Sequence, residues 1–285
     1  MSKTIMNQDI NKAFLEEYTS ETSVRRYTSA SAGCGISYLL DQVYGGLYIQ
    51  TIKTELKDLI GPEGIRVFEY GCGGGMNLIT LLRLLKQNGI KVHEAYGSDF
   101  SPVLIEAAKR EAAAHLDAET AGKIKFFVAR NESLMGDFEK HFGRPAAEFK
   151  NRLHLAIGVN TSRYCHRLKE EQKSTDQIRD LLMPGGVSIM IDMNDKFPLF
   201  RSKIKGKRVT DNALETYIPP LAEYARPFKA AGLEILQERT FCWVPHSAGK
   251  LMCFTMRTLA PVLQTVFPAH GMRSLVVARK SRKSA

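Results

Sequence analysis

The 285-residue chain lacks several features that would place it in a specialised class of protein. No apolar run reaches the roughly 18 residues that a membrane-spanning helix needs, and residues 1–14 lack the apolar core of a signal peptide. Its five cysteines are irregularly spaced and form no CxxC pair, which argues against a disulfide framework and against a zinc site. We therefore expect a cytoplasmic protein that neither contacts a membrane nor holds a metal.

Acidic residues are missing from two short stretches. The formal charge of +10 comes from 40 basic and 30 acidic residues. Residues 196–208 hold six basic residues and residues 273–285 hold five, and neither stretch contains an acid. These 11 residues account for the whole surplus, so the positive charge is not spread over a broad face of the kind that binds nucleic acid. We expect the second stretch to end as a solvated, frayed tail.

Strand-like and helix-like patterns alternate after about residue 60. Strands are predicted at 65–71, 91–99, 124–129, 153–159, 185–193, 234–244 and 273–280. Helices are predicted at 76–89, 101–116, 167–182 and 219–231. Residues 245–272 are predicted to be irregular, and a helical pattern before residue 60 is interrupted by Gly45 and Gly46. The alternation predicts an α/β protein with a mostly parallel sheet and helices on both faces.

A glycine-rich segment, VFEYGCGGGMN at 67–77, joins the first strand to the first helix. Such a turn brings backbone N–H groups and a helix N-terminus against a ligand. The dinucleotide pattern G-x-G-x-x-G fails because Met76 occupies the third glycine position, and the Gly-Lys-Ser/Thr of a nucleotide-binding P-loop is absent. The segment therefore indicates close approach of a ligand other than these two.

The pattern Glu-x-Gly-x-Gly-x-Gly at 69–75 resembles motif I of the class I S-adenosylmethionine-dependent methyltransferases. Other motifs of that family follow in order across residues 65–193, and more loosely to 280. The resemblance implies a three-layer Rossmann-like methyltransferase fold with a seven-stranded, mostly parallel sheet and an N-terminal helical cap. We expect residues 1–60 to form the cap or lid and residues 61–285 the methyltransferase domain. Substrate-side insertions are expected near 194–217 and 245–272.

The same resemblance implies S-adenosyl-L-methionine as the cofactor. In the family, an acid after the second strand binds both ribose hydroxyls, and Asp99 stands at that position. The segment VARNESL resembles the part that contacts adenine, with Asn131 where aspartate is usual. The residues expected to bind the cofactor are Glu69, Gly71, Gly73, Gly75, Asp99, Phe100, Asn131 and Glu132.

The substrate is expected beyond the fourth and fifth strands, next to the cofactor. Residues 160–163 read Asn-Thr-Ser-Arg, so the Asn/Asp-Pro-Pro-Tyr/Phe motif of many N-methyltransferases is absent. Cys165 lacks the preceding proline of cytosine C5 enzymes and is expected to be a packing residue. The predicted substrate-binding residues are Asn160, Arg163, Tyr164 and Arg167. The two arginines form either an anion clamp or a solvated helix face.

His166 is the candidate general base, with Glu170 four residues later and on the same face if the segment is helical. The alternative is that both are ordinary surface groups at the start of a helix. Two such ligands are too few to indicate a metal.

The favoured function is methylation of a small anionic metabolite, either in natural-product synthesis or on an isoprenyl diphosphate. In the latter, Glu170 would remove a proton and the cations of 196–208 would hold the diphosphate. An RNA methyltransferase, with the basic stretches on phosphates, is the second hypothesis. A non-catalytic protein that binds S-adenosylmethionine is the third. The sequence leaves the acceptor atom and the oligomeric state open.

Overall fold

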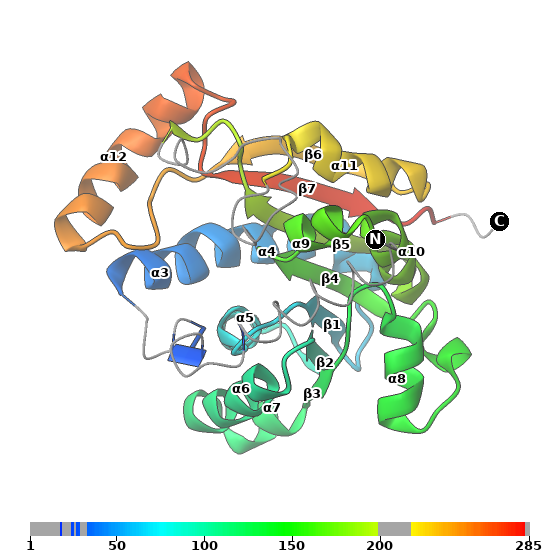
Figure 1. Ribbon diagram of the computed structural model, residues 1–285. Coiled ribbons are helices and arrows are strands. Elements are labelled where there is room, and N and C mark those ends of the chain that lie inside the picture. The colour runs from blue at the N-terminus through cyan, green and yellow to red at the C-terminus, as the bar shows by residue number, and fades with distance from the viewer. Residues whose placement is uncertain (1–17, 19–23, 26, 29–32, 199–217, 283–285) are drawn as a thin grey trace.

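The computed structural model describes residues 18, 24, 25, 27, 28, 33–198 and 218–282. Its centre is a seven-stranded sheet in the order β3-β2-β1-β4-β5-β7-β6 (Figure 1). The strands are β1 (Ile65–Tyr70), β2 (Val92–Asp99), β3 (Ile124–Val128), β4 (Leu153–Val159), β5 (Leu182–Met193), β6 (Glu234–Phe241) and β7 (Arg273–Arg279). Only β7 runs antiparallel to its neighbours β5 and β6. The predicted α/β class, with a mostly parallel seven-stranded sheet, is confirmed.

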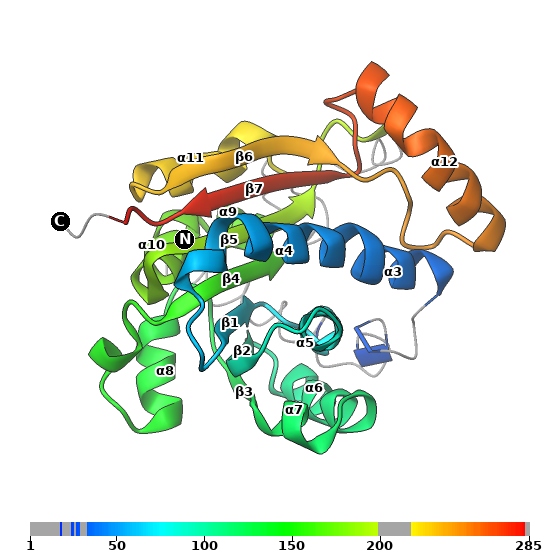
Figure 2. The same ribbon diagram turned by 180° about the vertical axis from the view of Figure 1, so that it is seen from behind.

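Helices cover both faces of the sheet (Figures 1 and 2). The longer ones are α5 (Met76–Gln87), α6 (Pro102–His115), α8 (Leu134–Phe142), α10 (Glu171–Leu181), α11 (Leu221–Ala230) and α12 (Lys250–Val266). The shorter ones are α7 (Ala118–Gly122), η5 (Ala146–Phe149) and α9 (Ser162–Leu168). Among the described residues, no helix is both long and apolar enough to cross a membrane.

Alternating side chains of the strands face two separate cores. In β1, Ile65 and Val67 pack with the helices that precede and follow the strand, whereas Phe68 and Tyr70 pack with α8 and α10 on the other face. All four are at most 1% exposed, so the strand is buried on both faces. This burial explains why the predicted strands read as continuous apolar runs.

One continuous helical rod precedes β1. It comprises α3 (Cys34–Tyr38), η2 (Leu39–Tyr44), α4 (Gly45–Thr51), η3 (Ile52–Leu56) and η4 (Lys57–Leu59). The expected interruption at Gly45 and Gly46 is wrong, because both residues are helical. Gly45 instead allows α5 to approach: a methyl group there would lie 2.2 Å from Leu84 Cδ1. The division of the chain at residue 60 stays a prediction.

Substituting these two glycines is expected to have opposite effects on stability. Alanine is favoured over glycine inside a helix by about 1 kcal/mol, and nothing lies within 4 Å of a methyl group added at Gly46. Gly46→Ala should therefore raise the free energy of unfolding by about 1 kcal/mol. Gly45→Ala should lower it by about 1–3 kcal/mol because the added methyl overpacks the contact with α5. Urea unfolding of both variants tests this, and stabilisation by both would contradict the packing explanation.

Two other predicted elements differ in the structure. The single helix expected at 167–182 is divided into α9 and α10, because Lys169 adopts a left-handed conformation with φ of 62°. The insertion at 245–272, expected to be irregular, contains the 17-residue helix α12. Most of the basic stretch 196–208 and of the insertion 194–217 lies outside the described residues.

Candidate functional site

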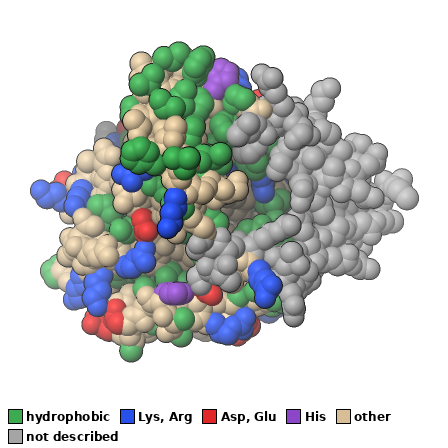
Figure 3. Space-filling model, turned by 90° about the vertical axis from the view of Figure 1, so that its left-hand side faces the viewer, with side chains coloured by type: hydrophobic (Ala, Val, Ile, Leu, Met, Phe, Trp, Pro, Cys, Tyr) green, Lys and Arg blue, Asp and Glu red, His purple; other side chains and the backbone are tan. Residues whose placement is uncertain are grey.

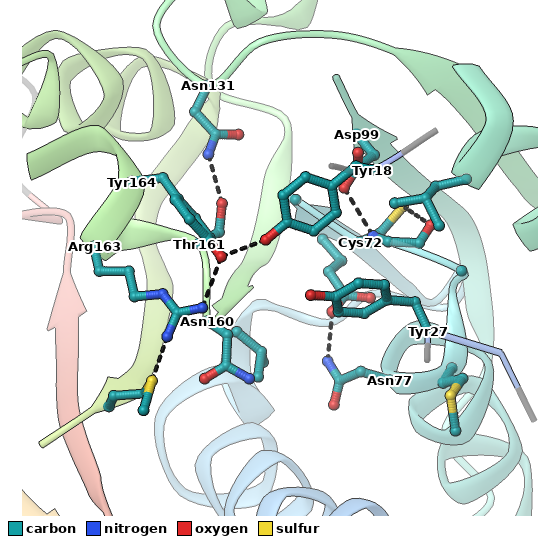
Figure 4. Close-up of a pocket in the computed structure, with 18 of the residues that line it drawn as sticks. Tyr18, Tyr27, Cys72, Asn77, Asp99, Asn131, Asn160, Thr161, Arg163 and Tyr164 are labelled. Carbon is teal, nitrogen blue, oxygen red and sulfur yellow. Dashed lines mark hydrogen bonds between the residues drawn. The ribbon is translucent and has the colours of Figure 1, made fainter. Parts of the chain in front are cut away.

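A cavity of about 670 Å³ opens at the carboxyl ends of the parallel strands. It lies where the strand order reverses between β1 and β4, which is the usual position for a ligand in an open α/β sheet. Figure 4 shows Asp99 and Cys72 on one side of it and Arg163 on the other. We call these the glycine-loop side, after residues 71–75, and the arginine side, after Arg163 and Arg273.

The glycine-loop side is formed by the turn between β1 and α5. Gly71 and Gly73 have φ values of 65° and 54°, which residues with a side chain rarely adopt. A methyl group on Gly71 would also lie 2.4 Å from Thr161 Oγ1. The N–H of Gly73 donates to Asp99 Oδ2 (3.0 Å), and the N–H of Ser101 donates to Asp99 Oδ1 (2.9 Å). These bonds fix the Asp99 carboxylate at the end of β2, and burial raises its pKa to about 6.

Glu69 lies beneath the loop and is 2% exposed. Its Oε1 accepts a hydrogen bond from Asn77 Nδ2 at 2.8 Å, whereas its buried Oε2 has no hydrogen-bond partner among the described residues. Burial raises the pKa of Glu69 to about 8, although Asn77 and the backbone of Leu78 oppose the rise. A buried, half-satisfied carboxyl group that lines a cavity is suited to a ligand that carries a donor or a positive charge.

The raised pKa of Glu69 predicts a specific pH dependence of stability. The folded state binds this proton more tightly than the unfolded state, so stability should fall as pH rises from about 4.5 to about 8. Glu69→Gln keeps the acceptor for Asn77 but cannot ionise, so the fall should be smaller in the variant. Urea unfolding at pH values across that window measures the difference, and identical profiles for the two proteins would contradict the assignment. In Glu69→Gln, stability should still fall as the pH rises from about 3.8 to about 6, because the pKa of Asp99 is also raised.

Aromatic residues before α3 line the same cavity. The Tyr18 ring lies between Asp99 and Tyr164 (Figure 4), and its hydroxyl is hydrogen-bonded to that of Tyr164. Tyr18 also packs edge-to-face on Phe100, with 5.4 Å between ring centroids, and stands 5.6 Å from the ring of Tyr27. The N-terminal segment thus contributes side chains to the cavity wall at these positions.

Arg273, the first residue of β7, lies on the arginine side and is 2% exposed. Its guanidinium donates to Tyr44 Oη (2.9 Å) and Asn160 Oδ1 (2.9 Å), and it contacts the ring nitrogens of His246, the nearer being Nε2 at 2.6 Å. Asn160 has a φ of 56°, a left-handed conformation that asparagine tolerates better than most residues. Each of these three side chains can offer an uncharged acceptor atom to the guanidinium group.

The second guanidinium on this side belongs to Arg163. It donates to Tyr164 Oη at 2.7 Å and contacts Met193 Sδ. The fully buried carboxylate of Asp192 accepts N–H groups from the backbone of Arg163 (2.9 Å) and Met193 (2.8 Å). Among the described residues, neither Arg163 nor Arg273 forms an ion pair with a carboxylate at 4.0 Å or less. Two positive charges therefore face the cavity, and the carboxylate of Asp192 interacts electrostatically with both of them.

His246 does not add to that charge at neutral pH. Desolvation and the positive charges of Arg273 and Arg163 lower its pKa, so the imidazole stays neutral even though part of the ring is open to the cavity. A neutral ring nitrogen accepts a hydrogen bond, which suits the position beside the Arg273 guanidinium.

Most of the predicted site residues lie around the cavity. Those that line it are Glu69, Gly71, Gly73, Asp99, Phe100, Asn131, Glu132, Asn160, Arg163 and Tyr164. The amide nitrogen of Asn131 donates to Thr161 Oγ1 at 2.9 Å, which leaves its oxygen as the atom that can accept from a ligand. Gly75 is not in the wall: it precedes α5, and a methyl group there would lie 3.1 Å from Ala108 Cβ and 3.2 Å from Phe126 Cζ.

Besides Gly75, three predicted residues are not brought to the cavity: His166, Glu170 and Arg167. His166 is 1% exposed and packs on Tyr224, with 5.3 Å between ring centroids. Its Nδ1 lies 3.8 Å from a carboxylate oxygen of Glu171 and not of Glu170. The expected pair does not form because α9 ends at Leu168, so residues 166 and 170 do not share a helix face.

Arg273 and His246 also line the cavity but were not predicted from the sequence. Arg273 belongs to the basic stretch 273–285, and His246 belongs to the segment 245–272 that was predicted to be irregular. The sequence does hold one signal: Arg273 stands two residues before the apolar run LVVA, so its charge lies at the start of a buried strand.

No protein-family model matches the sequence, and no curated protein is similar to it in sequence. Solved structures are similar to its fold. The CMeT domain of the citrinin polyketide synthase has a TM-score of 0.54 and 17% identity, covering 87% of this chain and 56% of its own. The cyclase SpnF has a TM-score of 0.54 and 16% identity, covering 85% and 83%. An S-adenosylmethionine-dependent methyltransferase from Mesorhizobium loti has a TM-score of 0.54 and 17% identity, covering 85% and 100%.

The chain thus spans little more than half the length of the first of these structures. At identities of 16–17% the likeness shows a shared fold.

Proposed function

We propose that this protein, whose fold is that of the class I S-adenosylmethionine-dependent methyltransferases, transfers a methyl group to a small anionic metabolite. The observation that carries the proposal is a single cavity with two different sides. One side holds the glycine loop with the carboxyls of Glu69 and Asp99, and the other holds the guanidinium groups of Arg163 and Arg273. A cationic cofactor and an anionic acceptor would each meet groups of the opposite charge.

The residues of the glycine-loop side fit S-adenosylmethionine. The resemblance of motif I implies that Asp99 would hold the ribose hydroxyls and that Glu69 would meet the amino group of the methionine part. The unsatisfied Oε2 of Glu69 supports this, because a bound ammonium would supply its partner and favour the ionised carboxylate. The carboxylate of Asp99 keeps lone pairs beyond those used by Gly73 and Ser101, since each oxygen can accept two hydrogen bonds.

The arginine side supports an anionic acceptor. Guanidinium groups bind carboxylates and phosphates through paired N–H donors, and Arg273 has five such donors, three of which are accounted for by Tyr44, Asn160 and His246. Buried positive charge in excess of its counter-charge is costly. A bound anion would offset that cost, which supports the chemical class of acceptor proposed here.

The chemistry needs alignment more than an acid or a base. When bound, the cofactor supplies a methyl group on a positively charged sulfur. Holding the acceptor in line with that methyl group can provide most of the acceleration. Tyr18, Tyr27 and Phe100 would exclude water from the reacting groups. We assign no general base, because His166 and Glu170 lie away from the cavity wall, and the isoprenyl-diphosphate variant thereby loses its proposed base.

The neighbouring structures support a small organic acceptor only by analogy. One is a domain of a polyketide synthase, and another is named as a cyclase. Since one fold can host different reactions, the test must detect methyl transfer itself. The protein is incubated with labelled S-adenosylmethionine and an extract separated into RNA and small-molecule fractions. We expect label in the anionic part of the small-molecule fraction. Label in RNA alone would favour the second hypothesis, and no label with intact cofactor binding would favour the third.

A further inference from the structure

Helix α12 packs on the rest of the protein by one narrow face. Cys253, Met256, Ala260 and Leu263 form that face and contact the rod that precedes β1 and the adjoining core. Trp243 Nε1 donates to Gln264 Oε1 at 3.1 Å and fixes the same side of the helix. The positions recur every three or four residues, so the inner face is a regular helical stripe. Figures 1 and 2 show α12 projecting from the sheet beside α3.

The outward face of α12 is apolar. Figure 3 shows hydrophobic side chains gathered on it, at the top of that view. Seven of the nine exposed large hydrophobic residues in the described part of the chain belong to this helix and the residue after it. They are Leu251 (80% exposed), Met252 (52%), Phe254 (71%), Leu259 (45%), Val262 (59%), Val266 (60%) and Phe267 (49%). Such a concentration marks an interaction surface, whereas scattered exposed apolar residues do not.

The polar residues on this face are threonines whose hydroxyl groups are bonded within the helix. Thr255 donates to the carbonyl of Leu251 (3.0 Å), Thr258 to that of Phe254 (3.1 Å) and Thr265 to that of Pro261 (2.9 Å). Hydroxyl groups bonded to the carbonyl four residues earlier leave mainly methyl groups outward. A protein partner would need about one hydrogen bond for every 100–200 Å² of interface, and these hydroxyl protons are already used.

The charged residues in the sequence around α12 are all positive. The segment that contains α12, residues 239–272, has Arg239, Lys250 and Arg257 and no acidic residue. Lys250 begins the helix and is exposed, and the guanidinium of the exposed Arg257 lies 5.2 Å from the ring centre of Tyr38 at the edge of the apolar face. An apolar helix face bordered by cations is the pattern of helices that lie in the interface of an anionic membrane.

We propose that the outward face of α12 binds the surface of a membrane that contains anionic lipids. The helix would lie in the plane of the surface with Phe254 and Val262 among the acyl chains and Lys250 and Arg257 at the headgroup phosphates. This binding departs from the expectation of no membrane contact, which considered only spanning helices and signal peptides. It does not depend on methyl transfer, because the face lies outside the cavity wall.

The test is sedimentation of the full chain with vesicles of phosphatidylcholine alone or mixed with phosphatidylglycerol. We expect binding to the mixed vesicles that weakens with added salt, and much less binding to the neutral ones. Phe254→Asp should reduce the partition coefficient by about tenfold or more, because one exposed aromatic side chain no longer enters the acyl region. Since Phe254 is 71% exposed, the variant should keep the melting temperature of the wild type.

Val103→Asp is the matched control, because it places the same charge at an exposed apolar position on α6 (36% exposed). It should bind vesicles as the wild type does. Three results would overturn the proposal: no binding of the wild type to mixed vesicles, an equal loss in both variants, or self-association of the wild type that Phe254→Asp abolishes without any vesicle binding. The last result would assign the face to a second copy of the chain.

Discussion

Replacing Asp99 with alanine is expected to weaken binding of S-adenosylmethionine by about a hundredfold or more. A hydrogen bond to a charged group contributes about 1.5–3 kcal/mol, and the carboxylate would accept from two ribose hydroxyls. Its position is fixed by the N–H groups of Gly73 and Ser101, so little ordering is needed when the ligand binds. Calorimetric titration of the purified protein measures the change.

Two companion variants make the result specific. Glu106→Ala removes an exposed carboxylate from the nearby helix α6 and should leave the affinity unchanged. Asp99→Asn keeps one acceptor oxygen and should bind with an affinity between those of wild type and Asp99→Ala. An unaltered affinity in Asp99→Ala, with the fold intact by circular dichroism, would remove the cofactor assignment.

Replacing Arg273 with methionine is expected to abolish detectable methyl transfer while the affinity for S-adenosylmethionine stays within about twofold, since the glycine-loop side is untouched. The side chain is buried and holds Tyr44, Asn160 and His246 together. Losing these bonds should also lower the free energy of unfolding by about 3 kcal/mol. Label transfer, calorimetry and urea unfolding measure the three effects separately.

The conservative change Arg273→Lys separates charge from geometry. Lysine keeps the positive charge but lacks the planar fork that reaches three acceptors at once, so partial activity with partly restored stability is expected. Arg239→Met on the neighbouring strand β6, where the side chain is exposed, should leave transfer and affinity unchanged. Full methyl transfer by Arg273→Met would exclude the arginine side as the acceptor site, while leaving the cofactor assignment in place.

Local patterns in the sequence predicted the strands and the glycine turn, and the resemblance to motif I implied the residues of the glycine-loop side. Strands such as β1 and β4 are short apolar runs bounded by turns. Asp99 stands two residues before Ser101, the N-cap of α6. Burial on both faces of a parallel strand leaves a signal within the strand itself, so these elements were predictable one at a time.

The arginine side could not be predicted in this way. Arg273 reaches the cavity only because β7 runs antiparallel between β5 and β6, which a run of four apolar residues does not reveal. The assignment of His166 depended on a helix continuing past Lys169, and one left-handed residue removed the shared face. Helix α12 was predicted to be irregular, and it holds Pro261 in its interior, a residue that usually ends a helix.

The hydrogen bond between Arg273 and Tyr44 joins residues 229 positions apart. Contacts of such long sequence separation require a large loop to close before they contribute, and they slow folding. The arginine side should therefore be among the last parts of the molecule to assemble, after the central parallel strands have paired. A ligand bound there would act mainly on the rate of unfolding and hardly on the rate of folding, because its site is unformed in the transition state. Protection of the protein by its acceptor would then appear as a longer lifetime of the native state.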